Sequence, residues 1–356
     1  MQQLTCVGPS KIEWREVDEP RIESGGEALV RPLAVARCDI DPFLISGLLP
    51  QRGPFALGHE AVVEIVAVGD GVRRHAVGDR AVVSFQLSCG RCVRCSSGRS
   101  ASCADYPLLS DYGMQPLSGV EYGGMLSDLV RVPHADAMLE PIPAGFDPAA
   151  LASVSDNVLD GYRSVAPHLA RRPGVPVLFV CHGVRSVALY GVLAALALGA
   201  ERVDVASDDA ALLALAEKLG AKPIETDFET RLGPYPLVVD AGLRVEGLRL
   251  ALHATEPDGV CQAVSFYPGG GVEMPLGKAY TKGLDFHIGR AHAVSLLPEV
   301  MPLIASGRLQ PERVTTRVVD WAEAPEAYLE DSIKLVVRRS PAGLTTRSDP
   351  ASSPAG

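Results

Sequence analysis

Four cysteines in one short segment constrain this chain more than any other feature of its sequence. Residues 88–103 read SCGRCVRCSSGRSASC, so the cysteines follow the spacing C-x2-C-x2-C-x7-C. Four thiolates on one loop can surround a tetrahedral ion without help from the rest of the fold, and zinc in such a closed shell is structural. We therefore predict a structural zinc site whose ligands are Cys89, Cys92, Cys95 and Cys103.

Two other uses of these cysteines stay open. The first three spacings also suit an iron–sulfur cluster, but the bacterial cluster pattern ends in Cys-Pro, whereas Ala104 follows the last cysteine here. Disulfides are the second alternative, and they belong to oxidising compartments. Residues 1–20 are polar and charged and do not resemble a signal peptide, so we expect a reducing, cytoplasmic setting.

Length and charge narrow the class of protein. A chain of 356 residues is longer than one hydrophobic core usually holds, which predicts two domains. The net charge of −10 argues against nucleic-acid binding, which needs a basic surface. The longest apolar run, residues 187–200, is too short to span a bilayer, so we expect a buried helix and no membrane partner.

The pattern of apolar residues changes along the chain. In the first part, up to residue 150, short runs rich in valine and alanine suggest strands in a partly barrel-like domain. From residue 172 onward, apolar strands alternate with helical segments, which is typical of a doubly wound parallel sheet. The predicted fold class is therefore α/β with a separate β-rich domain. Residues 341–356 are rich in serine, proline and alanine, and we expect them to be disordered.

A second set of metal-binding side chains is spread over the sequence. Cys38 and His59 offer a thiolate and an imidazole, and Asp156 is a candidate for the third ligand. A single cysteine or histidine is more often a packed core residue, so the prediction requires all three to meet in space. Three protein ligands leave one position of a zinc ion open for substrate, which is the pattern of catalytic sites.

Taken together, these segments resemble the medium-chain zinc-dependent alcohol dehydrogenases. The resemblance rests on Cys38 with Asp41, the GHE triplet, the run VGDGVRRHAVGDR, the cysteine segment and the run ASGRLQPERVTTRVVDWAEAPEAY. It implies a GroES-like β-rich catalytic domain and a Rossmann nucleotide-binding domain. The implied boundaries are residues 1–153 and 293–340 for the catalytic domain, 88–110 for its structural zinc lobe and 154–292 for the Rossmann domain.

The same resemblance implies roles for individual residues. Cys38, His59 and Asp156 would hold a catalytic zinc ion, so that each chain carries two zinc ions. Glu60 would be an exchangeable fourth ligand, and Asp41 would orient His59. The implied reaction is NAD(P)-linked interconversion of an alcohol and an aldehyde or ketone by hydride transfer. The implied partners are a small-molecule substrate and further copies of the chain in a homodimer or homotetramer.

The proton path departs from the family pattern. Ile40 stands where relatives carry a hydroxyl residue, and Phe43 stands where many carry a histidine. Neither side chain can relay a proton. Either water or a cofactor hydroxyl does so instead, or the reaction differs. In the second case, the chain would be an NADPH-dependent reductase of a polarised C=C or C=N bond.

The glycine-rich turn of the nucleotide site is also altered. Residues 181–186 read CHGVRS where relatives show G-x-G-x-x-G, so only Gly183 remains, followed by Val184 and Arg185. Arg185 either contacts phosphate or faces solvent. The loss of the other glycines keeps open a different class of function, a family member that binds a ligand or nucleotide without catalysis.

The choice between NAD and NADP rests on the end of the second Rossmann strand. Ser207 stands where an acid would bind the ribose of NAD, which gives a slight preference for NADP. Asp208 and Asp209 follow directly and would repel a 2′-phosphate. Asp39 stands where several relatives carry a basic or neutral residue. Two residues at later strand ends, Asp240 and Ser265, are further candidates for cofactor contacts.

Overall fold

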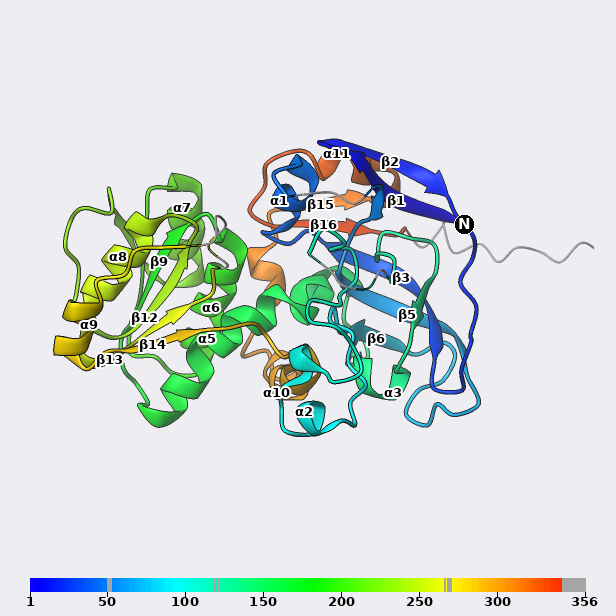
Figure 1. The fold of residues 1–356 in the computed structure, drawn as a ribbon, viewed down its shortest axis with the longest axis horizontal. Helices are drawn as coiled ribbons and strands as arrows, with labels where there is room; N and C mark the ends of the chain where they lie inside the picture. The colour runs from blue at the N-terminus through cyan, green and yellow to red at the C-terminus, as the bar shows by residue number, and fades with distance from the viewer. Residues whose placement is uncertain (50–52, 118–119, 121, 266, 268–270, 341–356) are drawn as a thin grey trace, which may run out of the picture.

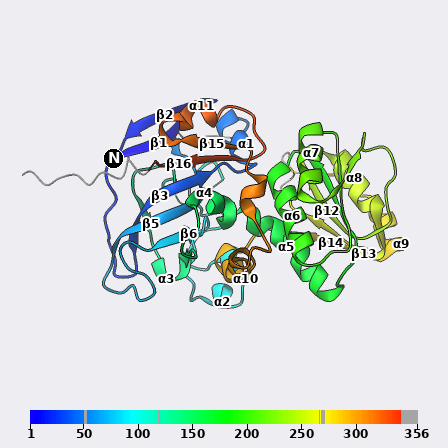
Figure 2. The same cartoon turned by 180° about the vertical axis from the view of Figure 1, so that it is seen from behind.

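Two sheet-based parts lie side by side, with helices between them (Figure 1, Figure 2). The structure is a computed structural model that describes residues 1–49, 53–117, 120, 122–265, 267 and 271–340. The predicted α/β fold class is confirmed, since one part is β-rich and the other carries a six-stranded parallel sheet. Residues 341–356, expected to be a disordered tail, lie outside the described residues.

The β-rich domain is built on a seven-stranded sheet. Its strand β5 (Glu60–Val68) reads EAVVEIVAV, and these β-branched side chains suit a pleated, largely buried surface. β5 pairs antiparallel with β3 (Ala28–Ala36), and the register sets Glu60 opposite Ala36, two residues before Cys38. The other strands are β6 (Arg80–Val83), β7 (Val130–Val132), β8 (Leu139–Pro141), β15 (Arg317–Asp320) and β16 (Leu335–Arg338).

Both ends of the described chain contribute to this domain. β16 pairs antiparallel with β3, with Val336 opposite Ala36, and so brings residue 334 beside the end of β3. A smaller antiparallel sheet is formed by β1 (Gln2–Gly8), β2 (Lys11–Glu16) and β4 (Phe55–Ala56). The cysteine segment forms a lobe around the short helix α2 (Val93–Ser96).

The second part, here called the parallel-sheet domain, has the strand order β11-β10-β9-β12-β13-β14. The order reverses between β9 and β12, so the carboxyl ends of these two strands form the switch point where such sheets bind ligands. The strands are β9 (Val177–His182), β10 (Val203–Ser207), β11 (Lys222–Glu225), β12 (Tyr235–Gly242), β13 (Thr255–Ala263) and β14 (Asp285–Ile288).

Helices cover both faces of the parallel sheet and join it to the β-rich domain. α5 (Asn157–Arg171) and α6 (Arg185–Ala197) pack closely, because a Cβ on Gly161 would come within 2.5 Å of the backbone N of Gly191. The remaining helices of four or more residues are α1 (Asp41–Ser46), α3 (Ala135–Met138), α4 (Pro148–Leu151), α7 (Ala210–Leu219), α8 (Val245–Ala254), α9 (Leu276–Lys282), α10 (Ala293–Ala305) and α11 (Ala324–Ala327).

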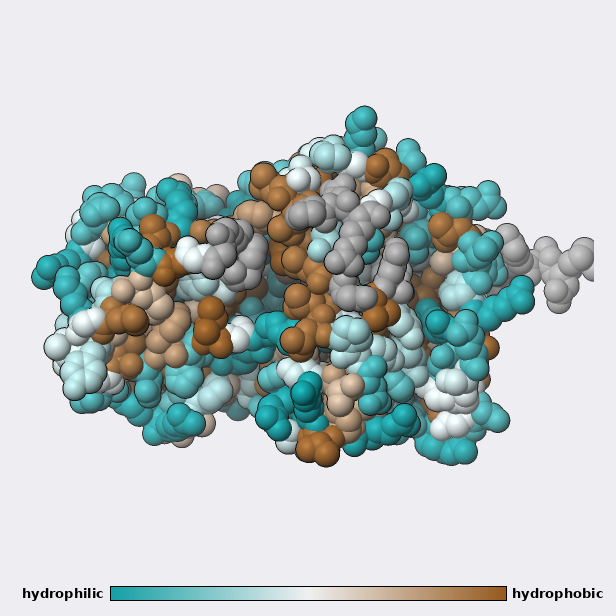
Figure 3. Space-filling model, in the orientation of Figure 1, coloured by the Kyte–Doolittle hydropathy of each residue, from teal (hydrophilic) through white to brown (hydrophobic). Residues whose placement is uncertain are grey.

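The long apolar run forms a buried helix, as predicted. Most of it lies in α6, where the ten successive residues from Ser186 to Ala195 are buried. Arg185, the first residue of the helix, is partly exposed. Among the residues that the structure describes, none of the helices has the length and apolar character needed to cross a membrane. Apolar side chains also gather along the boundary between the two domains on the face shown in Figure 3.

Candidate active site and metal centres

The four cysteines of the lobe come together as predicted. Their sulfur atoms all lie within 4.8 Å of one another, and those of Cys92 and Cys103 are 3.9 Å apart. Four sulfurs at zinc–thiolate bond lengths form a tetrahedron with edges of about 3.8 Å, so the set fits a zinc ion. All eight cysteines of the chain are free, which removes the disulfide alternative for this structure.

Backbone amides donate hydrogen bonds to sulfur atoms of this group. The amide of Cys92 donates to Cys89 Sγ at 3.4 Å, and that of Cys95 donates to Cys92 Sγ at 3.5 Å. The amide of Ala104 also donates to Cys92 Sγ, at 3.4 Å. The amides of Ala104 and Cys95 lower the pKa of Cys92 to about 6, because an N–H group stabilises the thiolate form. Burial instead raises the pKa of Cys89 to about 11 and raises that of Cys95 as well. The thiolate is the form that binds metal.

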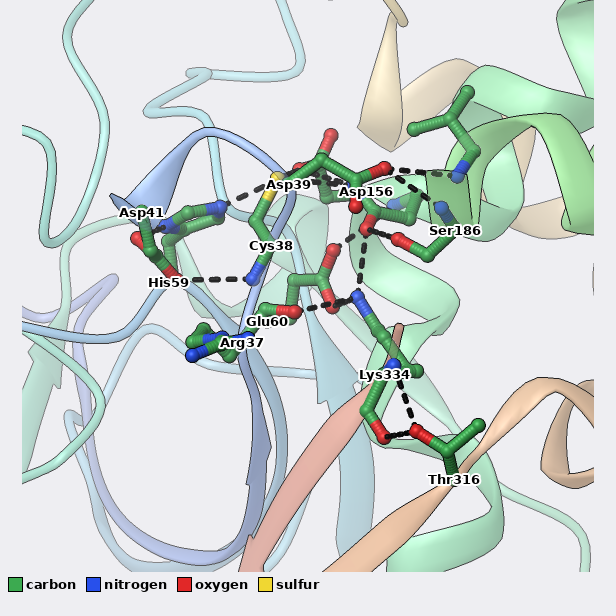
Figure 4. A network of polar contacts seen from close by, with 12 residues as sticks. Arg37, Cys38, Asp39, Asp41, His59, Glu60, Asp156, Ser186, Thr316 and Lys334 are labelled. Carbon is green, nitrogen blue, oxygen red and sulfur yellow. Dashed lines mark hydrogen bonds and ion pairs between the residues drawn. The ribbon is translucent and has the colours of Figure 1, made fainter. Parts of the chain in front are cut away.

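The second predicted group also comes together, at the boundary between the two domains (Figure 4). Donor atoms of Cys38, His59, Glu60 and Asp156 all lie within 4.8 Å of one another. Cys38 Sγ is 3.2 Å from Asp156 Oδ2, and His59 Nε2 is 3.4 Å from the same oxygen. The β3–β5 pairing positions the first three residues, and the start of α5 positions Asp156.

Asp156 faces the site because of its place on α5. It is the N-cap residue of the helix, yet its side chain makes no capping hydrogen bond. The carboxylate instead points toward Cys38 and His59. Burial by itself would raise the pKa of Asp156, but the adjacent His59 outweighs burial and lowers it. The residue is therefore held as a carboxylate, which is the form that binds a metal ion.

His59 supplies the test of whether a metal ion fits. The ring is fully buried, and neither nitrogen makes a hydrogen bond within the described structure. Buried polar atoms are rarely left without a partner, so a cation at Nε2 would satisfy an atom that is otherwise orphaned. Burial would lower the pKa of His59, but the carboxylates of Asp41 and Asp156 outweigh it and raise the pKa to about 9. Once the imidazole has lost its proton to a binding metal ion, the donor set of one thiolate, one imidazole and one carboxylate suits zinc.

Asp41 lies on the far side of the imidazole. Its Oδ1 is 3.5 Å from His59 Nδ1, and its Oδ2 accepts a hydrogen bond from the Cys38 amide at 2.9 Å. The carboxylate is fully buried at the start of α1. It therefore contacts both the ring and the backbone of the neighbouring thiolate residue, a position that suits orienting His59.

Sequence reasoning missed Lys334, which is fully buried beside this group. Its ammonium donates to Glu60 Oε2 and to Asn157 Oδ1, both at 2.6 Å, and to the Arg37 carbonyl at 2.9 Å. Glu60 Oε1 accepts a hydrogen bond from the backbone N–H of Asn157 at 3.1 Å. Glu60 is thus paired with a cation of the protein. A lysine directly before the apolar run LVVR was a signal that could have been noticed.

Asn157 was also missed, although it follows the predicted ligand Asp156. Its Nδ2 donates to Cys38 Sγ at 3.0 Å and to Asp156 Oδ2 at 3.1 Å. Its Oδ1 accepts from Ser186 Oγ at 2.7 Å as well as from Lys334. One buried side chain therefore links the thiolate, the lysine and the first turn of α6.

Two cavities adjoin the site. The larger holds about 460 Å³ and has Cys38 and Asp156 in its wall, together with apolar side chains such as Ile40, Phe85 and Ile288. The other holds about 390 Å³ and lies over the carboxyl ends of β9 and β10. Both cavities are lined by residues of both domains.

Of the residues predicted to bind a dinucleotide, three line the second cavity and two line the larger one. Gly183 has φ +111°, a backbone conformation that strains any other residue, and a Cβ there would come within 2.8 Å of Leu243 Cδ1. Arg185 is partly exposed, and its side chain pairs with Asp331 and lies 3.5 Å from Asp209. Val184 lines the larger cavity, and its amide donates to the Ala241 carbonyl at 3.1 Å.

The remaining predicted contacts follow the same sheet edge. Ser207 lines the second cavity at the end of β10, and its hydroxyl accepts from the Asp209 amide at 3.1 Å. Ser265 lines the larger cavity after β13. Asp240 is fully buried near the end of β12, where it accepts a hydrogen bond from the Tyr267 hydroxyl. Asp240 does not line either cavity.

Comparisons with known proteins agree with this geometry. The family described as "Alcohol dehydrogenase GroES-like domain" matches residues 24–144. "Zinc-type alcohol dehydrogenase B" of Aspergillus flavus is 26% identical over 349 residues, which cover 92% of this chain and 78% of that protein. A "probable zinc-binding alcohol dehydrogenase" of Mycobacterium tuberculosis is 27% identical, covering 92% of this chain and 84% of the relative. The solved structure of an alcohol dehydrogenase from Thermus sp. ATN1 superimposes with a TM-score of 0.87 at 28% identity, covering 96% of this chain and all of that one.

Proposed function

Because this chain belongs to the medium-chain zinc-type alcohol dehydrogenase family, we propose that it interconverts an alcohol and an aldehyde or ketone by NAD(P)-linked hydride transfer. The observation that carries the proposal is the meeting of Cys38, His59 and Asp156, of which Cys38 and Asp156 line the wall of a cavity between the two domains. The dinucleotide would lie along the carboxyl ends of β9 and β12, where the strand order reverses.

The chain's own residues would hold and tune the metal ion. Cys38, His59 and Asp156 would bind it, and Asp41 would orient the imidazole. When bound, zinc supplies a Lewis acid that favours the alkoxide form of an alcohol and stabilises negative charge on a carbonyl oxygen. Glu60 lies within the same group and would be the exchangeable fourth ligand, although its Oε2 pairs with Lys334.

The lining of the larger cavity favours an apolar substrate. Ile40, Phe85, Leu109, Met114 and Ile288 surround the space next to the thiolate. Such walls exclude water, which strengthens every charge interaction at the reacting atoms. We therefore propose a small, predominantly apolar alcohol–carbonyl pair.

A second candidate reaction is favoured by Ile40. This side chain lines the cavity next to Cys38 and offers no hydroxyl to carry a proton outward. An NADPH-dependent reduction of a polarised C=C or C=N bond would depend less on that path. The slight preference for NADP rests on Ser207, and we expect any 2′-phosphate to lie near Arg244, which pairs with Asp208 at 3.3 Å.

We further propose that the chain assembles into a homodimer or homotetramer. Leu276 and Tyr280 are apolar and exposed on α9, the helix that directly precedes β14, the last strand of the parallel sheet. Exposed apolar side chains of this kind are suited to contact with a second copy.

Metal analysis and kinetics would test the dehydrogenase proposal together. We expect about two zinc ions per purified chain and turnover of apolar alcohols or ketones with NAD(H) or NADP(H). Cys38→Ala should leave about one zinc ion and lower kcat by at least about a hundredfold. Cys261→Ala, a buried cysteine outside both groups, is the matched control and should change neither. One zinc ion in the unaltered protein, or no binding of either reduced cofactor by fluorescence titration, would reject the proposal.

A further inference from the structure

The first turn of α6 lies at the centre of the proposed dinucleotide site. The helix follows β9 at the switch point of the sheet, and its N-cap residue Val184 contributes no side-chain hydrogen bond. In this fold, the free backbone amides at that helix end bind the phosphates of a dinucleotide. The group that accepts hydrogen bonds from these amides in this chain therefore affects whether a phosphate can bind there.

The partner is the carboxylate of Asp39. Its Oδ2 accepts hydrogen bonds from the amides of Ser186 at 2.9 Å and Val187 at 3.1 Å (Figure 4). Asp39 belongs to the other domain, in the loop between β3 and α1, and directly follows Cys38. A side chain from the β-rich domain thus supplies the negative charge that the end of α6 attracts.

Asp39 also lies between the two cavities. It lines the space of about 460 Å³ next to Cys38 and the space of about 390 Å³ next to Ser207. A dinucleotide has a nicotinamide end and an adenosine end joined by a diphosphate. A ligand that places one end in each cavity must therefore pass its diphosphate over Asp39.

Negative groups outnumber positive ones around the smaller cavity. The smaller cavity is lined by four aspartates, Asp39, Asp208, Asp209 and Asp331, and by two arginines, Arg37 and Arg185. The guanidinium of Arg185 is already paired with Asp331 and lies near Asp209. That of Arg37 donates to the carbonyls of residues 328, 330 and 332. Both guanidinium groups thus already make contacts within the protein.

We infer that Asp39 is a built-in competitor for the phosphate site of α6, and that a dinucleotide binds there only when this carboxylate leaves the helix end. The inference rests on the proposed function and names a residue that sets the affinity for the cofactor. Its consequence is that phosphate-bearing ligands bind more weakly than the cavities alone would allow, because like charges repel at short range.

Calorimetric titration with three probes would test the inference. Asp39→Asn removes the charge and keeps an oxygen that can accept hydrogen bonds from the two amides. Asp39→Ala removes the acceptor, so that both amides lose their partner. We expect the Kd for NADH and for ADP to fall by about tenfold or more in both variants. The Kd for adenosine, which has no phosphate, should stay unchanged.

Asp136→Asn is the matched control, because Asp136 also accepts from two successive amides, those of Arg73 and Arg74, but lines neither cavity. It should leave all three affinities unchanged, and thermal melting would verify that each variant folds. Equal Kd values for NADH in the unaltered protein and both Asp39 variants would overturn the inference while leaving the dehydrogenase proposal intact. Binding only by the variants would support the inference and reject the dehydrogenase proposal. Absence of NADH and ADP binding throughout would reject both.

Discussion

Lys334 is the residue whose burial has the largest energetic consequence in the site. Its ammonium and the Glu60 carboxylate have no exposed surface, and the pair is held at 2.6 Å. Burial alone would lower the pKa of Lys334, but the charge of Glu60 outweighs burial and raises it. Burial raises the pKa of Glu60 to about 7 against the effect of Lys334. Each partner therefore needs the other in order to stay charged in the interior.

Removing only the lysine should be strongly destabilising. We expect Lys334→Met to lower the free energy of unfolding by about 3–5 kcal/mol, because Glu60 would remain buried without its counter-ion. The double variant Lys334→Met/Glu60→Gln should recover part of that loss, and urea denaturation would measure both. Lys222→Met, on an exposed lysine of β11, is the control and should change little. An unfolding midpoint for Lys334→Met equal to that of the control would contradict the expectation.

Asp240 should make stability depend on pH. Burial raises its pKa from 3.8 to about 7, and its Oδ1 has no hydrogen-bond partner in the described structure. The stabilising contribution of this group is complete below the unfolded pKa and is lost as pH rises through the folded one. Asp240→Asn cannot titrate. We therefore expect the melting temperature of the unaltered protein to fall relative to this variant between about pH 5 and about pH 8.

Differential scanning fluorimetry across that range would measure the effect. Asp227→Asn is a suitable control, because Asp227 is exposed and the Thr230 amide lowers the pKa of its carboxyl. Its titration lies below this range, so no drift is expected. Parallel melting curves for Asp240→Asn and the unaltered protein would show that the carboxylate is stabilised by contacts other than those described.

At the scale of elements, the cysteine lobe depends on its ligands more than on a core. It contains only the short helix α2 and a three-residue turn of 3₁₀ helix, Ser100–Ser102. Its buried hydrophobic side chains are mainly the ligand cysteines themselves, with Tyr106 packed against them. Elements this short are rarely stable without a metal ion or a cross-link.

Cys95→Ala should therefore remove the lobe zinc and lower the melting temperature markedly, because metal binding contributes directly to folding. Elemental analysis and thermal melting on the same sample would measure both effects. Cys261→Ala serves as the control for loss of a buried thiol and should keep both zinc ions. An unchanged melting temperature with the lobe zinc absent would show that the lobe folds without it.

At the scale of the whole molecule, the two metal groups differ in what surrounds them. Cys38 and Asp156 of the first group line a cavity between the domains, whereas the four lobe cysteines do not line either described cavity. A small chelator should therefore reach the first group sooner. We expect activity to be lost with the first zinc ion and the melting temperature to fall with the second. Timed dialysis against 1,10-phenanthroline, with zinc content, activity and melting followed together, would check the order. Simultaneous loss of all three would contradict it.

Much of this architecture could be predicted from residue patterns. The alternation of strands and helices after residue 172 predicted the parallel sheet, because the spacing of apolar residues differs between a helix and a strand. The cysteine spacing predicted the lobe, since all four ligands belong to one loop. The group of Cys38, His59 and Asp156 needed the family resemblance as well, because its members are up to 118 residues apart.

Features that depend on local spacing could be predicted from the residues: the fold class, the zinc lobe and the buried helix α6. Contacts between distant segments became known only from the folded chain. Lys334 reaches Glu60 because β16 pairs with β3, and Asp39 reaches the amides of α6 from 147 residues earlier in the chain. The physical reason is that such pairings are selected by the packing of whole elements. No single run of residues records which charge will lie at the end of which helix.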